Sequence, residues 1–457
     1  MTDTNKQRQV LLICNDVVGE RMAGPGIRYW EFARVLSNSF TVMLAVPPFV
    51  KMKTSPGQPD FAAELVICRR EAELRALTAK ADVIITLGTV PLVYPFLANT
   101  GKPLVSDLYD PFLLSGLSQY ADRPSAERVA HHEGYRRALN LQIEAADFFI
   151  CASEKQRDYW LGMLSALGRI NPYTHDDDPT MRRLIDIVPF GLPAEPPRQT
   201  TPVLKGVYKT IAADDKVILW GGGIWNWFDA PTLIQAMALI TRQRPNVKLF
   251  FIGVERSNVS LPRMQAAEEA IALSQELRLY DRYVFFNDWV PYQERQNYLL
   301  EADIGVSLHP NLVEGRFAFR TRFLDYLWAG LPIVATEGDV MSEQVREWRL
   351  GRLVAPGDVQ GVTTAILDLL DTPDLRASYQ SRFDQAAARY QWEVVTAPLV
   401  NFCANPRLAP DKAYLKQVYP VGTGETLPSK AWRTLISQGV SGLMRQINEY
   451  LRWRLQQ

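Results

Sequence analysis

Histidine and cysteine are both scarce in this chain, which has four of each in 457 residues. The cysteines, Cys14, Cys68, Cys151 and Cys403, stand far apart, and the first three lie in apolar runs that are typical of strands. Spacing of this kind favours reduced side chains in the protein core over a disulfide framework. We therefore expect a protein of a reducing compartment.

The chain also lacks net charge and long apolar stretches. Fifty basic residues balance fifty acidic ones, so no overall field gathers nucleic acid or another acidic polymer, and an anion site must be local. No stretch approaches the ~18 apolar residues of a membrane span, and the N-terminal MTDTNKQRQ has no apolar signal core. The composition, 47% apolar and 22% charged, is that of a soluble globular enzyme, which we expect in the cytoplasm.

What the chain does contain is a repeated alternation of strands and helices. Strand-like segments such as QVLLICND, FTVMLAVP and ADVIITLG alternate with helical ones up to LIDIVPFG. The same order begins again at DKVILWGGG and ends near GRLVAP. Alternation of this kind predicts α/β domains with parallel, doubly wound sheets, whose ligands bind at the carboxyl ends of the strands. Two such domains facing one another form a cleft.

The proline-rich segment LPAEPPRQTTP marks the boundary between the halves. We predict an N-terminal Rossmann-like domain at 1–191, a linker at 192–202, a C-terminal Rossmann-like domain at 203–400 and an extension at 401–457. In the extension, apolar residues recur at helical spacing over 430–457 among several arginines. Such a helix suits an anionic membrane surface, and packing against the protein or a partner is the alternative.

Glycines follow the first strand of each half. Gly24 and Gly26 allow backbone amides to approach a ligand at a helix N-terminus, although a tight structural turn explains them equally. The third glycine of the dinucleotide fingerprint is missing, which disfavours a nicotinamide-dependent oxidoreductase. In the second half, Gly222 and Gly223 again indicate close approach to a ligand or a tight turn.

The order of LWGGG, LFFIGV, VFFNDWVPYQERQNYLLEADIGVSLHP and LDYLWAGLPIVAT resembles the C-terminal half of the GT-B glycosyltransferases of the large retaining group 1 family. GPGIRYWEFARVL, ADFFICASEKQRDYW and IDIVPFGLP are similar to landmarks of its N-terminal half, so the resemblance covers about residues 9–400. It implies the GT-B fold, with two Rossmann-like domains facing across a cleft. A nucleotide sugar would lie on the C-terminal domain, and the acceptor would enter from the N-terminal one.

The resemblance carries over unevenly to single residues. Asp325 stands where the family has the glutamate that binds the ribose hydroxyls. The partner glutamate, which contacts the donor sugar, falls on Phe317, and Glu314 is the nearest carboxylate. Tyr109 and Asp110 stand where the family often has His-Asp. The basic pair that usually holds the diphosphate is missing, because GGGIWNWFDAP contains neither arginine nor lysine.

Two arginines ahead of the ribose-binding helix offer a replacement. The guanidinium groups of Arg320 and Arg322, with the helix amides, suit phosphate oxygens. We therefore predict that they form a relocated diphosphate clamp. The alternative is that either arginine pairs with Asp325 or Glu314 and only fixes the loop.

The predicted site residues fall into three groups. The catalytic group is Arg320, Arg322, Glu314 and Asp110. The donor-binding group is Gly222, Gly223, Val290, His309, Arg320, Arg322 and Asp325, with a packed or capping histidine as the alternative for His309. The acceptor-side group is Gly24, Gly26, Arg28 and Tyr109.

The resemblance implies a nucleotide-sugar-dependent hexosyltransferase that retains anomeric configuration, in bacterial surface polysaccharide or glycolipid synthesis. Its partners would be a nucleotide-sugar donor and a saccharide or lipid-linked acceptor, with no nucleic acid, and with peripheral membrane contact through 430–457 left open. No cofactor or metal is expected, and HDDDP at 175–179 reads as a solvated loop. A GT-B epimerase or phosphorylase, and a non-catalytic sugar-nucleotide-binding or scaffold protein, remain alternatives.

Overall fold

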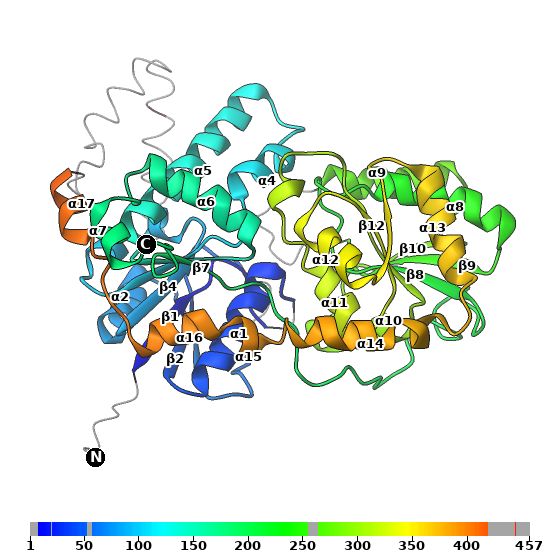
Figure 1. Cartoon of the computed structure of the whole chain (residues 1–457). Coiled ribbons are helices and arrows are strands. Elements are labelled where there is room, and N and C mark those ends of the chain that lie inside the picture. The colour runs from blue at the N-terminus through cyan, green and yellow to red at the C-terminus, as the bar shows by residue number, and fades with distance from the viewer. Residues whose placement is uncertain (1–7, 20, 53–56, 255–263, 419–443, 445–457) are drawn as a thin grey trace.

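The computed structural model describes residues 8–19, 21–52, 57–254, 264–418 and 444, and Figure 1 shows two α/β domains side by side. The predicted helix at 430–457 lies outside the described residues, apart from residue 444. Among the helices that the structure describes, none combines the length and apolar character that crossing a membrane requires.

The first domain is built on a seven-stranded sheet in the order β3-β2-β1-β4-β5-β6-β7. Every strand pair in it is parallel. Its strands are β1 (Gln9–Ile13), β2 (Thr41–Val46), β3 (Ala63–Ile67), β4 (Val83–Leu87), β5 (Leu104–Asp107), β6 (Phe148–Cys151) and β7 (Ile185–Ile187). Its helices are α1 (Gly24–Ser37), α2 (Glu71–Lys80), α3 (Val90–Val93), η1 (Pro95–Asn99), α4 (Phe112–Gln119), α5 (Ser125–Ala145), α6 (Glu154–Ala166) and α7 (Pro172–Asp177).

The second domain contains a six-stranded parallel sheet in the order β10-β9-β8-β11-β12-β13. Its strands are β8 (Lys216–Trp220), β9 (Val247–Phe251), β10 (Val284–Phe286), β11 (Ile304–Ser307), β12 (Ile333–Thr336) and β13 (Gly351–Val354). Its helices are α8 (Ala230–Gln243), α9 (Gln265–Glu276), η2 (Tyr292–Glu294), α10 (Arg295–Glu301), η3 (Gly315–Phe317), α11 (Arg322–Ala329), α12 (Val340–Trp348), α13 (Val359–Leu370) and α14 (Leu375–Ala388).

These sheets confirm the predicted architecture of two doubly wound domains. Strands β1, β4, β8 and β9 are buried almost from end to end, as parallel strands covered by helices on both faces must be. The segment HDDDP differs from the expectation of a loop, because its first residues complete α7. Asn171 caps that short helix through hydrogen bonds to its first-turn amides, which explains why a polar run is helical there.

The chain crosses between the domains twice at neighbouring positions. Leu192 leaves the first domain beside Gln391, with which it forms a parallel bridge. After α14, the helices α15 (Trp392–Val395) and α16 (Ala397–Ala404) lie against the first domain (Figure 1). Trp392 packs against Gly191, where a Cβ atom would come within 2.5 Å of the indole ring. The predicted boundaries at 191, 202 and 400 stay a prediction.

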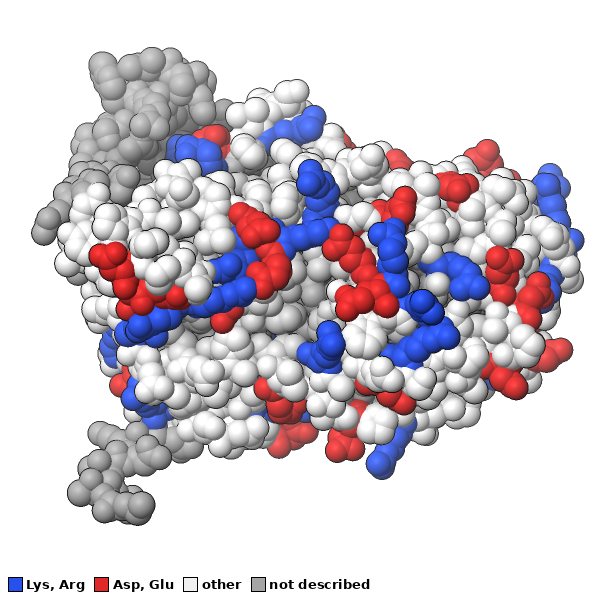
Figure 2. Space-filling model, in the orientation of Figure 1, with Lys and Arg blue, Asp and Glu red and all other residues white. Residues whose placement is uncertain are grey.

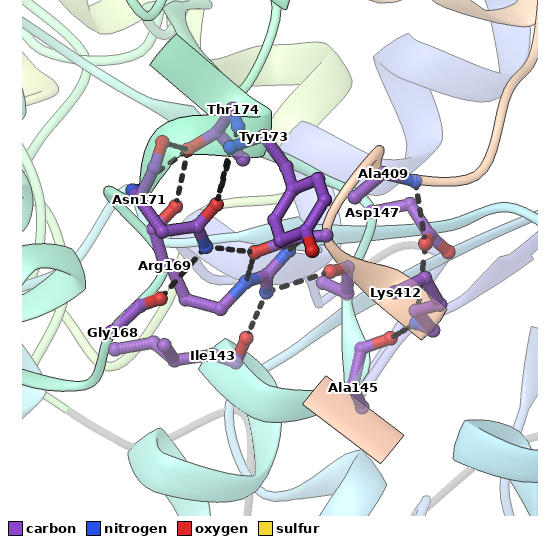
Figure 3. Close-up of polar contacts among 12 residues, drawn as sticks. Ile143, Ala145, Asp147, Gly168, Arg169, Asn171, Tyr173, Thr174, Ala409 and Lys412 are labelled. Carbon is purple, nitrogen blue, oxygen red and sulfur yellow. Dashed lines mark hydrogen bonds and ion pairs between the residues drawn. The ribbon is translucent and has the colours of Figure 1, made fainter. Parts of the chain in front are cut away.

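The last described helix, α17 (Lys412–Val418), is fixed to the first domain by buried charges (Figure 3). Asp411 accepts two hydrogen bonds from the Arg169 guanidinium, at 2.8 and 3.2 Å, and both side chains are fully buried. Next to this pair, Lys412 lies 3.2 Å from the Asp147 carboxylate. A buried pair of this kind tolerates no loss of one partner, so residues 405–415 are an integral part of the first domain.

Charges on the molecular surface are mixed. On the face drawn in Figure 2, basic and acidic side chains alternate over both domains, in line with the equal numbers of each in the sequence.

Candidate functional site

A cavity of about 560 Å³ lies between the two domains. The first domain contributes loops that follow β1, β4 and β5, and the second contributes loops that follow β8 and β10 together with the start of α11. These are the carboxyl ends of the strands, where doubly wound sheets bind ligands. Ten of the thirteen predicted site residues line the cavity: Gly24, Tyr109, Asp110, Gly222, Gly223, Val290, Glu314, Arg320, Arg322 and Asp325.

Arg322 is a buried cation without a carboxylate in hydrogen-bonding contact among the described residues. Its guanidinium packs on Phe228 and Trp220, with ring centroids 3.8 and 4.5 Å away. Nη2 donates to the Gly223 carbonyl at 2.9 Å, and Nη1 has no hydrogen-bond partner in the described part of the chain. Burial lowers the pKa of Arg322 to about 10, because a low-dielectric site disfavours the charged form. A guanidinium held in this way is ready to bind an anion.

The glycine loop next to Arg322 leaves space for that anion. Gly222 has a φ of 118°, which a side chain would strain, and a Cβ atom there would come within 3.9 Å of Arg322 Nη2. Tyr326, one turn further along α11, donates from its hydroxyl to backbone carbonyls and accepts from the Gly221 amide at 2.8 Å. The loop and the helix are thus held together.

Arg320 behaves differently from its neighbour. It donates to both oxygens of Glu314, at 2.6 and 3.1 Å, and both side chains are buried. A second carboxylate, that of Asp339, lies 3.9 Å from Arg320 Nε. The alternative of a pairing with Glu314 therefore describes Arg320, whose charge is balanced by buried carboxylates, whereas Arg322 packs on aromatic rings.

Asp325 is oriented by a residue that the sequence interpretation missed. Arg295 Nε donates to Asp325 Oδ1 at 2.9 Å, and its guanidinium lies between the rings of Tyr292 and Trp328, with centroids 3.7 and 4.6 Å away. Arg295 also lines the cavity. The sequence held one signal for this arrangement: Tyr292 and Arg295 are three residues apart, a spacing that places the ring and the cation one helical turn apart.

Asp110 faces the second domain from the opposite wall. Ser115 Oγ lies 3.5 Å from its carboxylate. Burial, with the negative charge of Glu314, raises the pKa of Asp110 to about 7, although Arg320 acts in the opposite direction. The carboxyl groups of Asp110 and Glu314, one from each domain, thus line the same cavity. With a pKa of about 7, the Asp110 carboxyl group titrates near neutral pH.

Three predicted residues lie behind the cavity wall. Arg28 is fully buried, and its guanidinium binds Asp107 together with the carbonyls of Val188 and Pro189, so it holds the first sheet to the segment that leaves it. Gly26 is required for packing, because a Cβ atom there would lie 2.0 Å from a backbone carbonyl. His309 contacts Asp339 at 3.4 Å beneath Arg320, which is the packed alternative.

Within the described ranges, no group of three or more histidine, cysteine, aspartate or glutamate side chains is arranged to hold a metal ion. Whether the reaction needs a metal stays a prediction from the resemblance.

Comparison with known proteins finds a family model that matches the second domain. Residues 215–372 match the family model described as glycosyl transferases group 1. A phosphatidyl-myo-inositol mannosyltransferase of Mycolicibacterium smegmatis is 26% identical over 168 residues, which are 37% of this chain and 39% of that protein. The corresponding enzyme of Mycobacterium leprae is 31% identical over 91 residues, 20% of this chain and 24% of that protein. The chain thus matches less than half the length of these relatives.

Solved structures extend the likeness to both domains. Sucrose-phosphate synthase from Thermosynechococcus elongatus aligns with a TM-score of 0.62 at 18% identity, over 87% of this chain and 98% of its own. HepE from Anabaena in complex with UDP-glucose aligns with a TM-score of 0.59 at 16% identity, over 87% and 99%. WaaG, a glycosyltransferase involved in lipopolysaccharide biosynthesis, also gives 0.59 at 16% identity, over 87% and 100%. These likenesses confirm the GT-B fold.

Proposed function

We propose that this chain, whose residues 215–372 match the glycosyl transferases group 1 model, transfers a hexose from a nucleotide-sugar donor to a saccharide or lipid-linked acceptor. The single observation that carries the proposal is the buried, unpartnered Nη1 of Arg322, in a helix that presents Asp325 to the same cavity. A cation and a carboxylate three residues apart suit the diphosphate and the ribose of one nucleotide. The matched relatives, named as mannosyltransferases, and the UDP-glucose complex of HepE support this substrate class.

The proposed reaction proceeds with retention of anomeric configuration. The bond between the sugar carbon and the leaving phosphate oxygen breaks, and the acceptor oxygen bonds to the same face of that carbon. The acceptor proton passes to the departing phosphate, so no protein nucleophile is required. Arg322 stabilises the negative charge that develops on the diphosphate, which is the main electrostatic demand of the step. Asp110 on the opposite wall orients the acceptor by accepting a hydrogen bond from one of its other hydroxyls.

Charge placement explains why this chain dispenses with the family's usual basic pair. The loop 221–231 contains neither arginine nor lysine, and Arg322 stacks on Phe228 from that same loop. Its guanidinium thus reaches the position next to the glycine backbone from a different element. We propose that this cation makes a metal unnecessary, so a chelator such as EDTA leaves the transfer rate unchanged.

The first test is a thermal-shift series with nucleosides, nucleoside diphosphates and nucleotide sugars, because a ligand of the native state raises its melting temperature as the site fills. The best donor is then incubated with labelled sugar and candidate saccharide or polyprenyl-phosphate acceptors, and NMR of the product gives its anomeric configuration. Retained configuration supports the proposal, and inversion refutes the mechanism.

Three other outcomes identify the alternatives. Epimerised donor in the absence of acceptor indicates an epimerase, and sugar phosphate formed from inorganic phosphate indicates a phosphorylase. Donor binding with neither hydrolysis nor transfer over the whole acceptor series indicates a binding protein. Bacterial surface polysaccharide or glycolipid synthesis is the proposed setting, and the acceptor that supports transfer tests it.

A further inference from the structure

The first two turns of α6 contact the second domain. Lys155 Nζ lies 2.5 Å from Glu343 of α12. The Tyr159 ring, one turn further along α6, lies 4.9 Å from the ring of Phe317 in η3. Phe317 stands at the position where the resemblance expects a sugar-binding glutamate, and its ring packs against the opposite domain instead. This contact therefore joins the two domains.

Between these two contacts lies Gln156, a fully buried amide. Its Oε1 accepts a hydrogen bond from the Ala152 amide at 2.8 Å. That contact orients the group, so both N–H bonds of Nε2 face acceptors. Nε2 donates to the Tyr109 carbonyl at 2.7 Å, in the first domain, and to the Phe317 carbonyl at 2.9 Å, in the second. Each donor and acceptor of the side-chain amide is used.

Both carbonyls belong to loops that carry carboxyl groups of the cavity. Tyr109 directly precedes Asp110, and the neighbouring carbonyl of Leu108 accepts a hydrogen bond from Trp160 of the same helix at 2.8 Å. On the other side, the Phe317 amide donates to the Glu314 carbonyl at 3.0 Å, which closes a turn around η3. One amide thus joins the loop of Asp110 to the loop of Glu314.

We propose that Gln156 is a positioning residue that sets the relative placement of Asp110 and Glu314 across the cleft. The proposal rests on the proposed function for its kinetic consequence, but its geometric part stands apart from any reaction. Loss of the amide would leave the half-buried carbonyls of Tyr109 and Phe317 without this donor and would separate the two loops. The carboxyl group of Asp110 would then face more water and less of the Glu314 charge.

The electrostatic surroundings of Asp110 make this separation measurable. Glu314 and Arg320 face it from the second domain, and Tyr109 and Tyr135 face it from the first. Burial and the Glu314 charge raise its pKa. Both causes weaken when the loops move apart, so the pKa falls toward the ordinary range of an aspartate.

The experiment compares Gln156→Met with Gln142→Met in the full chain. Gln142 is the matched control, because it is also fully buried and bonds only within the first domain, where it accepts from Ser106 at 2.9 Å. Asp110 is titrated by NMR of carboxyl-labelled aspartate, and its signal is assigned by its loss in Asp110→Asn. We expect the pKa of Asp110 to fall in Gln156→Met and to stay at the wild-type value in Gln142→Met.

Kinetics supply the second readout once a donor and acceptor are known. We expect kcat to fall about 10–100-fold in Gln156→Met with donor KM within about threefold, because misplacement of a reacting group by about 1 Å costs this much. Gln142→Met should keep kcat within about twofold of wild type. Equal Asp110 titration in the two variants and the wild type would overturn the proposal. A lowered pKa in Gln156→Met without any transfer by the wild type would refute the proposed function and leave the positioning role standing.

Discussion

Replacing Arg322 with methionine should weaken the binding of nucleoside diphosphates without weakening the fold. Nη1 has no partner in the described protein and Nη2 has one, so an entering diphosphate gains at least one charge-assisted hydrogen bond. Such bonds contribute ~1.5–3 kcal/mol, so the dissociation constant should rise about 10–150-fold. Binding of the nucleoside alone should change less than about twofold, because it has no phosphate for Arg322 to meet.

The effect on stability follows from the same burial. Burial lowers the pKa of Arg322 to about 10, and this decrease corresponds to roughly 3 kcal/mol against the charged guanidinium. Stacking on Phe228 and the hydrogen bond to Gly223 stabilise the buried guanidinium by about 2–3 kcal/mol. The two contributions nearly cancel. The free energy of unfolding of Arg322→Met should therefore stay within about 1 kcal/mol of the wild type.

The neighbouring arginine is the control, with the opposite expectation. Arg320→Met leaves the carboxylates of Glu314 and Asp339 buried without their cation, which should cost about 3–5 kcal/mol. Urea unfolding measures both variants, and isothermal titration calorimetry at one fixed salt concentration measures both ligands. Equal loss of nucleoside and nucleoside diphosphate binding in Arg322→Met, with a loss of stability like that of Arg320→Met, would refute the reasoning and assign Arg322 to the fold.

Three further predictions concern charged groups elsewhere in the molecule. The pKa of Asp110 is raised to about 7 in the native state, so the native protein keeps a proton that the unfolded chain loses above about pH 4. The free energy of unfolding should therefore fall as the pH rises from 4 to 7. Urea unfolding of Asp110→Asn at the same pH values should lack this dependence. Asp411→Asn removes the buried counter-charge of Arg169 and should lower the free energy of unfolding by about 3–5 kcal/mol, measured in the same way. Arg295→Met removes the 2.9 Å hydrogen bond to Asp325. Calorimetry should show that the binding of nucleoside and of nucleoside diphosphate weakens by the same factor, about tenfold. A loss confined to the nucleoside diphosphate would contradict a role of Asp325 at the ribose.

The strands and their order along the chain could be predicted from the local pattern of apolar residues. Apolar runs such as VLLI and VIITL form β1 and β4, because continuous runs of this kind suit only a sheet that helices cover on both faces. Asp325 in the first turn of a helix was also expected from order along the chain, and the structure has it there in α11. Arg322, expected ahead of this helix, is its first residue. Family resemblance added the cleft between the domains.

Pairing between distant side chains was not accessible to the same reasoning. The segment 314–325 presents two carboxylates and two candidate cations, and local order permits several pairings. Tertiary packing decided that Arg320 meets Glu314 and Asp339, while Arg322 turns onto Phe228 and Trp220. Electrostatic partners depend on distances of a few ångström in three dimensions, which no periodicity along the chain encodes.

The limit of sequence-based prediction is clearest for contacts between residues that lie far apart in the sequence. Arg295 lies 30 residues before Asp325, and Gln156 lies 161 residues before the Phe317 carbonyl that it binds. Hydrophobic periodicity reports only which face of an element is buried. By itself the sequence determined the elements, their order and the kind of sheet, because these depend on neighbours along the chain. Only the tertiary structure decided which arginine pairs with Glu314 and Asp339, which one stacks on Phe228 and Trp220, and which amide joins the two domains.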